Sequence, residues 1–419
     1  MLQHDASSDA SAAYRPGVRA RLRPAAPSRR HLRRAALSRE DRAALGIWAA
    51  AHLALLVLVW ASAWAFRGTP AHASLAGAFE HWDAYLLRNI AEYGYFGPHS
   101  IPNNTAFFPG YPAVLSVAHL VVRNWTLAEL AVPAVAGCFA VVSLARLGGG
   151  RRATLYLVTA PASVFLMVGY SEALFLALAA PAWRAAVRGR WWRAALLAGL
   201  AGLVRPDGLF LIPALVLMAL TGSYWPDQRP GPNGQPDAAS SPAGRGPRVP
   251  VRQRLASAAA ACTAVAGPAA YEVYLRVHTG SWMAWSNALR SGWDLHLSTP
   301  AQALRTTWWA AFRHPFSAST AFEFQLELGV MAVILVAAVA FAATRRWPEA
   351  VYCGLALVAL GTSTWYQTAP RTLLVLFPVW VALARLGERW PAIRYAYLAV
   401  STPIAVVLGM LFLSGRWAG

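Results

Sequence analysis

The sequence predicts an all-α polytopic membrane protein, and three observations support this prediction. Hydrophobic residues make up 57% of the 419 residues and charged residues only 13%, whereas a soluble globular protein carries roughly 25% charged residues. The apolar residues gather in about 11–12 segments, many of them near the length that crosses a hydrocarbon core of about 30 Å. The net charge of +19 comes from arginines in a terminal tail and in short connections, which is typical of topology determinants and not of a nucleic-acid-binding surface.

The first predicted element is an arginine-rich tail. Residues 1–43 hold ten arginines among Ala, Ser and Pro, without apolar periodicity. We therefore expect a disordered cytoplasmic tail and not a signal peptide. The apolar run 45–66 is the first predicted transmembrane helix, and the positive-inside rule directs it from the cytoplasm outward. The chain contains no lysine and much Ala, Gly and Pro, which predicts a GC-rich coding sequence and a bacterial source.

Residues 44–419 are predicted to form one transmembrane domain. Eleven further apolar runs are candidate spans: 107–123, 127–147, 153–169, 172–187, 192–204, 207–222, 256–275, 326–344, 348–364, 371–386 and 394–414. Arginine-bearing turns are expected in the cytoplasm, at 151–152, 188–193, 345–346 and 385–389, together with the Pro/Gly-rich loop 223–255. Strict alternation cannot satisfy all of these turns. Either one segment between 107 and 222 is re-entrant, or two segments fuse into a bent helix around Arg205-Pro206.

Two connections are predicted on the outer face, 67–106 and 276–325. The second is rich in tryptophan, at Trp282, Trp285, Trp293, Trp308 and Trp309. An indole suits the membrane interface, because its ring is apolar and its N–H finds water. Two readings stay open: an aromatic belt, or a sugar-binding platform.

The charged and aromatic cluster 81–95 in the first outer loop is the first candidate for chemistry. Its apolar and aromatic residues recur at three- and four-residue spacing, which predicts a short amphipathic helix at the interface. Arg88 and Glu92 are four residues apart and suited to pair. Asp83 has no opposite charge at helical spacing. It is therefore predicted either to be a free general base or to cap the helix start.

A proline-rich re-entry follows this cluster. The stretch Asn103 to Pro112 places Pro109 and Pro112 on either side of Gly110. Because these prolines cannot continue a preceding helix, the chain is expected to turn into the membrane abruptly here. The turn serves either as a hinge or as one wall of an entry for a lipid substrate.

Three polar insertions interrupt apolar runs, and ionisable groups at membrane depth usually face a cavity or a partner. Glu172, in Tyr170-Ser171-Glu172, is suited to orient an acceptor sugar, to pair with an arginine or to cap a helix. Arg205-Pro206-Asp207-Gly208 forms either a functional site or a Pro-broken turn whose charges cap each other. Arg371 either binds a lipid phosphate through its planar donors or snorkels to the interface.

Several sites that bind nucleotides or metals have no counterpart in the sequence. There is no Asp-x-Asp pair, no Walker loop with its lysine, and no Gly-x-Gly-x-x-Gly after a strand. Cys138, Cys262 and Cys353 lie singly in apolar runs, which predicts neither a disulfide framework nor a zinc site. We therefore expect no metal or other cofactor. Without a nucleotide-binding domain, the donor substrate is expected to be a membrane lipid.

The motifs together resemble the PIG-V-like mannosyltransferases. The resemblance lies in a Trp-Asp pair, an Ile-Ala-x-x-Gly-Tyr ending and a following Phe-Phe-Pro-x-Tyr-Pro, here His81-Trp82-Asp83, Ile90 to Tyr95, and Ala106 to Pro112. Weaker agreement extends to Tyr170-Ser171-Glu172, to Arg205-Pro206-x-Gly208, and to Arg371 with Phe377-Pro378. The likeness covers roughly residues 45–415.

This resemblance implies a GT-C-type glycosyltransferase that uses a polyprenyl-phosphate sugar, with the active site on the two outer loops. It assigns Asp83 as the catalytic carboxylate of an inverting reaction that yields an α-mannoside. Arg371 or Arg205 is the implied ligand of the donor phosphate. Further substrate-binding residues are expected at Trp82, Arg88, Glu92, Tyr170 and Glu172. Eukaryotic members act on the glycosylphosphatidylinositol anchor, and a bacterial source leaves the acceptor open among envelope lipids, glycans and proteins.

Two other classes of protein share this composition. A lipid or oligosaccharide transporter is also polytopic, but it is expected to show internal repeats with broken helices, which the sequence does not. A non-catalytic subunit for envelope assembly is the third reading. It predicts that replacing Asp83 leaves function intact.

Overall fold

The computed structural model describes residues 37–66, 75–222 and 249–416, and the regular elements in these ranges are helices. Residues 39–419 form one compact unit. In the described ranges four helices are long and apolar enough to cross a membrane, or five if the bent pair α17 (Ala369–Val375) and α18 (Phe377–Arg389) is one span. The prediction of an all-α polytopic membrane protein is therefore confirmed, although several predicted spans are shorter helices of 10–17 residues.

The first helix, α2 (Arg39–Ala65), begins earlier than predicted. Glu40 and Asp41 lie in its first turn, where negative charge is favourable. Asp41 accepts hydrogen bonds of 2.8–3.0 Å from Arg146. Residues 39–43 of the predicted tail are thus helical. Residues 1–36 of that tail, 67–74 of the first outer loop and 223–248 of the Pro/Gly-rich loop lie outside the described residues.

The predicted first outer loop is largely helical, with α3 (Leu75–Phe79), α4 (Asp83–Tyr93) and η2 (Asn104–Ala106). The amphipathic helix expected here is α4, which buries Ala84, Leu87 and Ile90. Asn89 ties the following segment to α4, since its Oδ1 accepts from Ile101 N at 3.0 Å and from Asn104 Nδ2 at 2.8 Å.

Tyr95 fixes the start of the proline-rich re-entry. Its hydroxyl donates to Phe107 O at 2.8 Å. Burial, and then the neighbouring Tyr271, raise the pKa of Tyr95 far above its usual value. The hydroxyl therefore keeps its proton and remains a donor to this backbone.

Helix α5 (Gly110–Val122) begins and ends at the same end of the bundle. Gly110 lies against the end of α9 (Trp191–Val204), where an added Cβ would stand 2.7 Å from Leu203 O. After Arg123, with a left-handed φ of 54°, the chain enters α6 (Trp125–Leu144), and Thr126 Oγ1 donates to Glu80 Oε1 at 2.7 Å. The 107–123 segment therefore lies at one end of the bundle, as expected if it is the segment that does not cross.

The next stretch runs as α6 (Trp125–Leu144), η3 (Ala145–Gly149) and α7 (Gly150–Val158). It turns at Gly148, whose φ is 94°. The predicted span 153–169 is not one continuous helix, because α7 ends at Val158 and a 3-10 turn, η4 (Ser163–Leu166), follows before the chain reaches Glu172. Pro161 lies between them, and proline disfavours helix both at its own position and at the residue before it.

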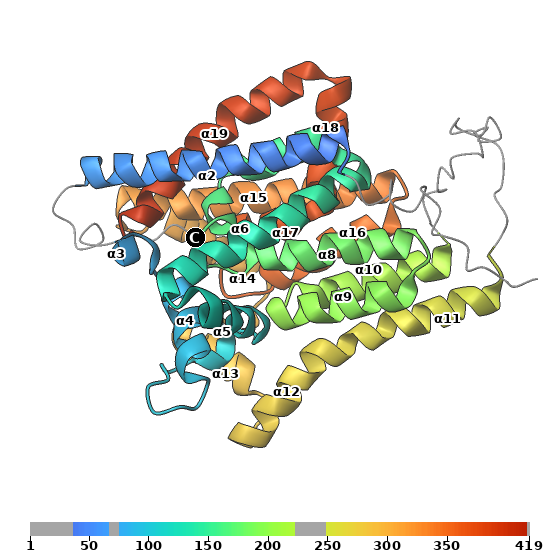
Figure 1. The fold of residues 1–419 in the computed structure, drawn as a ribbon, viewed down its shortest axis with the longest axis horizontal. Coiled ribbons are helices and arrows are strands. Elements are labelled where there is room, and N and C mark those ends of the chain that lie inside the picture. Colours follow the sequence, from blue (N-terminus) through green and yellow to red (C-terminus); the bar gives the residue numbers. More distant parts are fainter. Residues whose placement is uncertain (1–36, 67–74, 223–248, 417–419) are drawn as a thin grey trace, which may run out of the picture. The chain divides into compact units, whose positions relative to one another are not determined.

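Three helices of 14–16 residues lie side by side, α8 (Glu172–Val187), α9 (Trp191–Val204) and α10 (Gly208–Thr221) (Figure 1). The chain folds back between α9 and α10, so the alternative of one fused, bent helix at Arg205-Pro206 is wrong. Glycine permits this close return, since a Cβ on Gly208 would lie 2.4 Å from Gly202 Cα.

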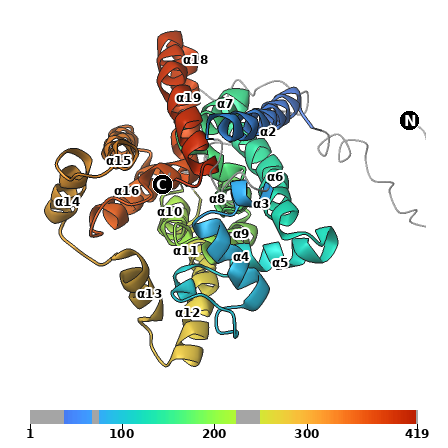
Figure 2. The same ribbon diagram turned by 90° about the vertical axis from the view of Figure 1, so that its left-hand side faces the viewer.

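The second half supplies the remaining helices. They are α11 (Val251–Cys262), η5 (Thr263–Val265), α12 (Ala266–Thr279), α13 (Ala284–Trp293), α14 (Pro300–Phe312), α15 (Ala318–Ala343), α16 (Trp347–Gly361), α17 (Ala369–Val375), α18 (Phe377–Arg389) and α19 (Pro391–Leu413). Figure 2 shows α14, α15 and α16 on one side and α5 and α6 on the other, with α8, α9 and α10 between them. The predicted second outer loop, 276–325, is therefore mostly helical.

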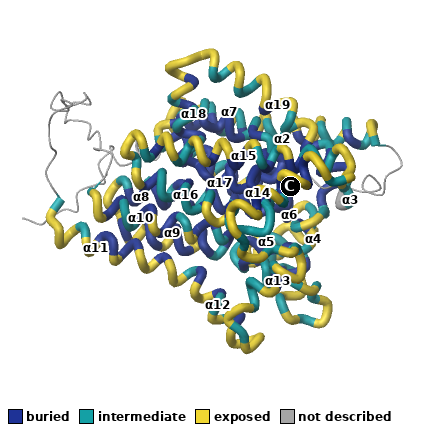
Figure 3. The backbone as a smooth tube through the Cα atoms, turned by 180° about the vertical axis from the view of Figure 1, so that it is seen from behind, coloured by how far each residue is buried: buried dark blue, intermediate teal, exposed yellow. Residues whose placement is uncertain are grey.

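The two ends of the bundle differ in chemistry. Near the start of α2, Arg151 N donates to Glu40 Oε2 at 2.8 Å, and Arg152 pairs with Glu388 at 2.6 Å. This arginine-rich end is opposite to Glu172, which opens α8, because Arg188 follows the last residue of that helix. Figure 3 shows the buried residues in the interior and exposed ones on outer helices. The exposed residues of α2 include Leu53, Leu56, Val57 and Trp60, as expected of a helix facing lipid.

Candidate active site

A chain of ion pairs joins five residues at the end of the bundle opposite the arginine-rich turns. Arg371 donates from Nη1 to Asp83 Oδ2 at 2.6 Å and from Nε to Glu172 Oε1 at 2.7 Å. Arg205 donates from Nη1 to the same Glu172 oxygen at 2.6 Å and from Nε to Asp207 Oδ2 at 2.9 Å. Four predicted site residues, Asp83, Glu172, Arg205 and Arg371, therefore form one cluster.

Helix ends position these side chains. Asp83 and Glu172 are the first residues of α4 and α8, where the helix dipole favours a carboxylate. Arg205 follows α9 in an extended conformation, which the next residue, Pro206, imposes by steric conflict. The pairing of Arg205 with Asp207 is the one expected for a Pro-broken turn.

A carboxylate outside the ion-pair cluster orders the helix that carries Arg371. Glu327 of α15 accepts from Thr368 N at 2.9 Å and from Ala369 N at 2.8 Å, one bond to each oxygen. These two N–H groups lie at the start of α17, where backbone donors have no partner within the helix. Thr368 has a left-handed φ of 63°, so Glu327 also stabilises an uncommon backbone turn.

Burial distinguishes Asp83 from the other members of the cluster. The Glu172 side chain is fully buried, and the Arg371 side chain keeps only 7% of its exposure. A buried charge that loses its partner is strongly destabilising, and the alternating charges of the cluster prevent this. The Asp83 side chain retains 17% exposure, so it is the carboxylate that a ligand can reach.

Two neighbouring aromatic rings, whose centres are 4.7 Å apart, contact the Arg371 guanidinium. Its central carbon lies 4.7 Å from the ring centre of Tyr170 and 5.0 Å from that of Phe165, within the range of cation–π attraction. The Tyr170 hydroxyl donates to His81 O at 3.3 Å. Tyr170, predicted to bind substrate, is thus buried against Arg371 and links it to the backbone before Asp83.

A cavity of about 420 Å³ opens beside the ion-pair cluster. Its lining includes Trp82, Asp83, Arg205, Gln367 and Arg371. Further wall comes from Phe107 of the proline-rich re-entry and from Trp293 at the end of α13. The cavity therefore combines a carboxylate, two guanidiniums and aromatic rings, a set suited to an anionic, partly apolar ligand.

Arg88 and Glu92 do not line this cavity. Arg88 forms an ion pair with Glu80 and a longer one, 3.7 Å, with Glu92. Its guanidinium also lies 5.9 Å from the Trp125 ring centre. The expected pairing of Arg88 with Glu92 is present, but the pair ties α4 to the start of α6 and contacts neither Asp83 nor Arg371.

The expectation that Asp83 is an unpaired carboxylate is wrong. Its partner, Arg371, lies 288 positions later, whereas the spacing argument considered only neighbours on one helix. Asp83 does open α4, yet its carboxylate is bonded to Arg371. The residue before it, Trp82, has a φ of 53°, a conformation that costs about 1–3 kcal/mol and that is often found at functional sites.

Sequence reasoning did not single out Glu327, Glu323 and Glu129. All three are almost fully buried in helices apolar enough to cross a membrane. Acidic residues in such helices are rare, and this was the available signal. Within the described ranges, no group of three or more His, Cys, Asp or Glu side chains is placed to hold a metal ion.

The sequence is similar to that of known enzymes over part of its length. No family model matches the chain. The chain is 36% identical over 168 residues to GPI alpha-1,6-mannosyltransferase 2 of Homo sapiens, a match covering 36% of this chain and 33% of the relative. It is 35% identical over 161 residues to that of Rattus norvegicus, covering 34% and 32%, and 37% identical over 153 residues to that of Mus musculus, covering 32% and 30%.

The matched segment spans about a third of the length of each of these relatives. These relatives are mannosyltransferases by name, as are the members of the family that the motifs resemble. The chain is therefore similar, over about a third of its own length, to PIG-V-like mannosyltransferases, which confirms the resemblance that its motifs indicated.

Proposed function

We propose that this protein is a membrane mannosyltransferase, which transfers a sugar from a polyprenyl-phosphate donor to a hydroxyl of a cell-envelope lipid, glycan or protein. The similarity to mammalian mannosyltransferases supports the reaction class. The observation that carries the proposal is the placement of Asp83, the reachable carboxylate, beside Arg371 in the wall of one cavity. Base and phosphate ligand would then face the same substrate.

The chemistry is a single displacement. Asp83 accepts the proton of the acceptor hydroxyl while that oxygen bonds to the anomeric carbon. The bond from this carbon to the phosphate oxygen breaks, and the polyprenyl phosphate leaves with the electron pair. Attack from the opposite face inverts the configuration, so a β-linked donor gives an α-mannoside.

The two arginines would stabilise the departing phosphate by charge-assisted hydrogen bonds. Arg371 uses its Nε and one Nη1 hydrogen in the contacts with Glu172 and Asp83. A guanidinium has five N–H donors, so donors remain for a phosphate. The buried carboxylates hold the guanidinium plane in place before the donor arrives, which lowers the cost of reorganisation.

Proton transfer to Asp83 also shifts the charge of the cluster in the useful direction. Three carboxylates and two guanidiniums, all ionised, sum to −1 (2 − 3). When Asp83 takes up the proton, the sum becomes zero and Arg371 loses one anionic partner. This happens as the leaving phosphate gains charge, so Arg371 becomes free to stabilise it.

The arginine pattern supports an N-terminus in the cytoplasm and an active site on the outer face. The turns at Arg151 and Arg188 lie at the end of the bundle opposite the ion-pair cluster, and the positive-inside rule assigns such an end to the cytoplasm. A lipid-linked donor then reaches the cavity from the outer leaflet.

The test compares Asp83→Asn with wild type in isolated membranes, supplied with radiolabelled polyprenyl-phosphate mannose and cell-envelope acceptors. Loss of a general base is expected to lower the transfer rate by about 10²–10⁴-fold. A parallel arm with a nucleotide-linked mannose checks the donor class, and no transfer is expected from it.

The matched control is Glu388→Gln, which makes the same change of carboxylate to amide at the opposite end of the bundle. Wild-type rates are expected for this variant. Equal transfer by Asp83→Asn and wild type would remove Asp83 as the base and favour a non-catalytic role.

A further inference from the structure

A second cavity, of about 500 Å³, adjoins the one that contains Asp83. Gly292, Trp293 and Gln367 line both cavities. A molecule in the second cavity would therefore lie next to the cavity that the ion-pair cluster lines. Nothing in the proposed reaction uses the second cavity.

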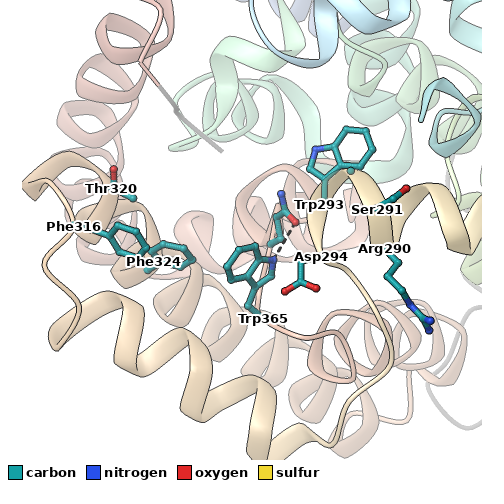
Figure 4. Close-up of a pocket in the computed structure, with 10 residues that line it drawn as sticks. Arg290, Ser291, Trp293, Asp294, Phe316, Thr320, Phe324 and Trp365 are labelled. Carbon is teal, nitrogen blue, oxygen red and sulfur yellow. Dashed lines mark hydrogen bonds between the residues drawn. The ribbon is translucent and has the colours of Figure 1, made fainter. Parts of the chain in front are cut away.

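Aromatic rings from three parts of the chain form one side of this cavity. Figure 4 shows Phe316, Phe324, Trp365 and Trp293 following one another along it. The Phe316 and Phe324 rings are nearly parallel, with centres 5.8 Å apart. Phe324 and Trp365 are 5.9 Å apart.

Hydrogen-bonding groups gather at the tryptophan end of the same cavity, where Figure 4 shows Asp294 and Arg290. The Asp294 side chain keeps 73% of its exposure. Gln367 Oε1 accepts from Trp365 Nε1 at 3.2 Å, which orients the amide and leaves its N–H donors for another partner.

Hydrogen bonds from the Thr364 hydroxyl and from the backbone hold together the two segments that carry Trp293 and Trp365. Thr364 Oγ1 donates to Asp294 O at 2.8 Å and accepts from His296 N at 3.0 Å. Ser298 N donates to Thr362 O at 2.8 Å. The position of Trp293 relative to Trp365 is therefore set before any ligand binds, which reduces the entropy lost on binding.

We infer that this second cavity binds a sugar ring of a saccharide acceptor, an inference that rests on the proposed function. A pyranose has an apolar face of C–H groups, which packs on an indole, and hydroxyls at its edge, which pair with a carboxylate, a guanidinium and an amide. The shared wall at Trp293 and Gln367 then presents an acceptor hydroxyl to Asp83.

An acyl chain fits these walls less well. It would cover the aromatic side, but it would also desolvate Asp294, Arg290 and Gln367 without replacing their hydrogen bonds to water, which is costly. The mixed lining therefore favours a sugar over a lipid tail.

Direct binding tests the inference without turnover. Saturation-transfer NMR would measure binding of methyl α-D-mannopyranoside and mannobiose to purified Asp83→Asn protein in lipid nanodiscs. Adding Trp365→Ala is expected to weaken binding about tenfold through loss of the stacking surface. Asp294→Asn, at an exposed side chain whose left-handed φ of 52° asparagine tolerates, is expected to weaken it without affecting folding.

Trp309→Ala is the control, because the Trp309 ring packs against His314 at 4.5 Å and does not line the cavity. Binding equal to the parent protein is expected. The inference is overturned if Trp365→Ala and Asp294→Asn both bind sugar as the parent does, or if a dodecyl chain binds there and no sugar does.

Transfer kinetics separate this inference from the proposed function. In otherwise wild-type protein, Asp294→Asn is expected to raise the KM for a mannobiose-bearing acceptor about tenfold, with the KM for the donor unchanged. Transfer with an unchanged acceptor KM would reject the acceptor site alone. Sugar binding that depends on Trp365, in a protein that transfers no sugar, would reject the proposed reaction and keep the binding site.

Discussion

Arg371 is the residue that connects the two carboxylates of the site. It bonds Asp83 and Glu172 at 2.6 and 2.7 Å and packs against the adjacent rings of Tyr170 and Phe165. A planar guanidinium has donors on three nitrogens and flat faces, so it satisfies both kinds of neighbour at once. A lysine ammonium is a point charge and has no such faces.

We therefore expect Arg371→Lys to keep the charge and lose the function. Its ammonium cannot hold Asp83, Glu172 and a phosphate in one plane, and the transfer rate should fall about 10²-fold or more. The measurement is kcat for mannose transfer in membranes, with Arg152→Lys at an exposed ion pair as the control. A rate within about twofold of wild type for Arg371→Lys would show that only the charge matters.

Glu172 is predicted to matter for stability as well. Its Oε1 accepts from both Arg205 and Arg371. In Glu172→Gln each buried guanidinium would keep only one carboxylate partner, Asp207 for Arg205 and Asp83 for Arg371. Removing one partner from buried charges costs about 3–5 kcal/mol. The free energy of unfolding, measured by denaturant titration in mixed micelles, should fall accordingly.

Glu388→Gln is the comparison for this stability measurement. It breaks an ion pair with Arg152 in which the Glu388 side chain is 63% exposed, and such pairs contribute at most about 1 kcal/mol. Equal stability of the two variants would contradict the role given to Glu172.

At the scale of single elements, α15 positions α17. Glu327 holds the first turn of α17 by two bonds to backbone N–H groups, and α17 carries Arg371 two residues farther on. Hydrogen bonds of this kind contribute about 0.5–1.5 kcal/mol each. Glu327 thus acts on the site through Arg371, as a positioning residue.

Replacing Glu327 by glutamine tests this role. The amide oxygen accepts one N–H, but the NH₂ group meets the other, so the start of α17 should shift. We expect kcat to fall and the acceptor KM to stay unchanged, because Arg371 acts on the leaving phosphate. Glu323→Gln, one turn earlier on α15 and also buried, is the control and is expected to retain kcat. Equal losses in both variants would indicate a general effect of α15 packing.

The observed helices can be compared one by one with the apolar runs that the sequence predicts. Most predicted apolar runs coincide with helices, because in an apolar solvent the backbone must satisfy its own hydrogen bonds, and Pro133, Pro181, Pro213 and Pro403 all lie inside such helices. The run 153–169 is not one helix, because α7 ends at Val158 and Pro161 lies between it and η4. The run 107–123 is helical, but as α5 it returns to the end where it began.

For the whole molecule, the return of α5 makes the arginine pattern consistent. If α5 stays at one end and the later helices alternate in direction, the arginine-bearing turns predicted in the cytoplasm all lie at the same end of the bundle. The ion-pair cluster and the two cavities lie at the other end. Together with the positive-inside rule, this arrangement supports the proposed reaction on the outer face.

Cysteine labelling tests this topology. In a variant with Cys138, Cys262 and Cys353 replaced, single cysteines at Pro98 and Arg123 should react with a membrane-impermeant maleimide added to intact cells. A cysteine at Glu388 should react only after permeabilisation. Labelling of the Arg123 position only after permeabilisation would mean that α5 crosses the membrane. Labelling of the Glu388 position in intact cells, with Pro98 and Arg123 labelled only after permeabilisation, would reverse the assignment of the ends.

By itself the sequence determined the class of protein and the separate members of the site. Scarce charge and long apolar runs leave a chain no stable state in water, so an all-helical membrane protein follows from composition. The same scarcity marked Asp83, Glu172, Arg205 and Arg371, because a charge among apolar residues is costly unless it has a partner or a function.

Only the tertiary structure decided which of these charges meet. The partners are separated by 33 to 288 positions, and helix periodicity describes contacts only three or four residues apart. Folding therefore paired Asp83 with Arg371 and left Arg88 with Glu80. It also brought Trp293 and Trp365 to one cavity, since such contacts depend on how helices pack and not on the order of residues along any one of them.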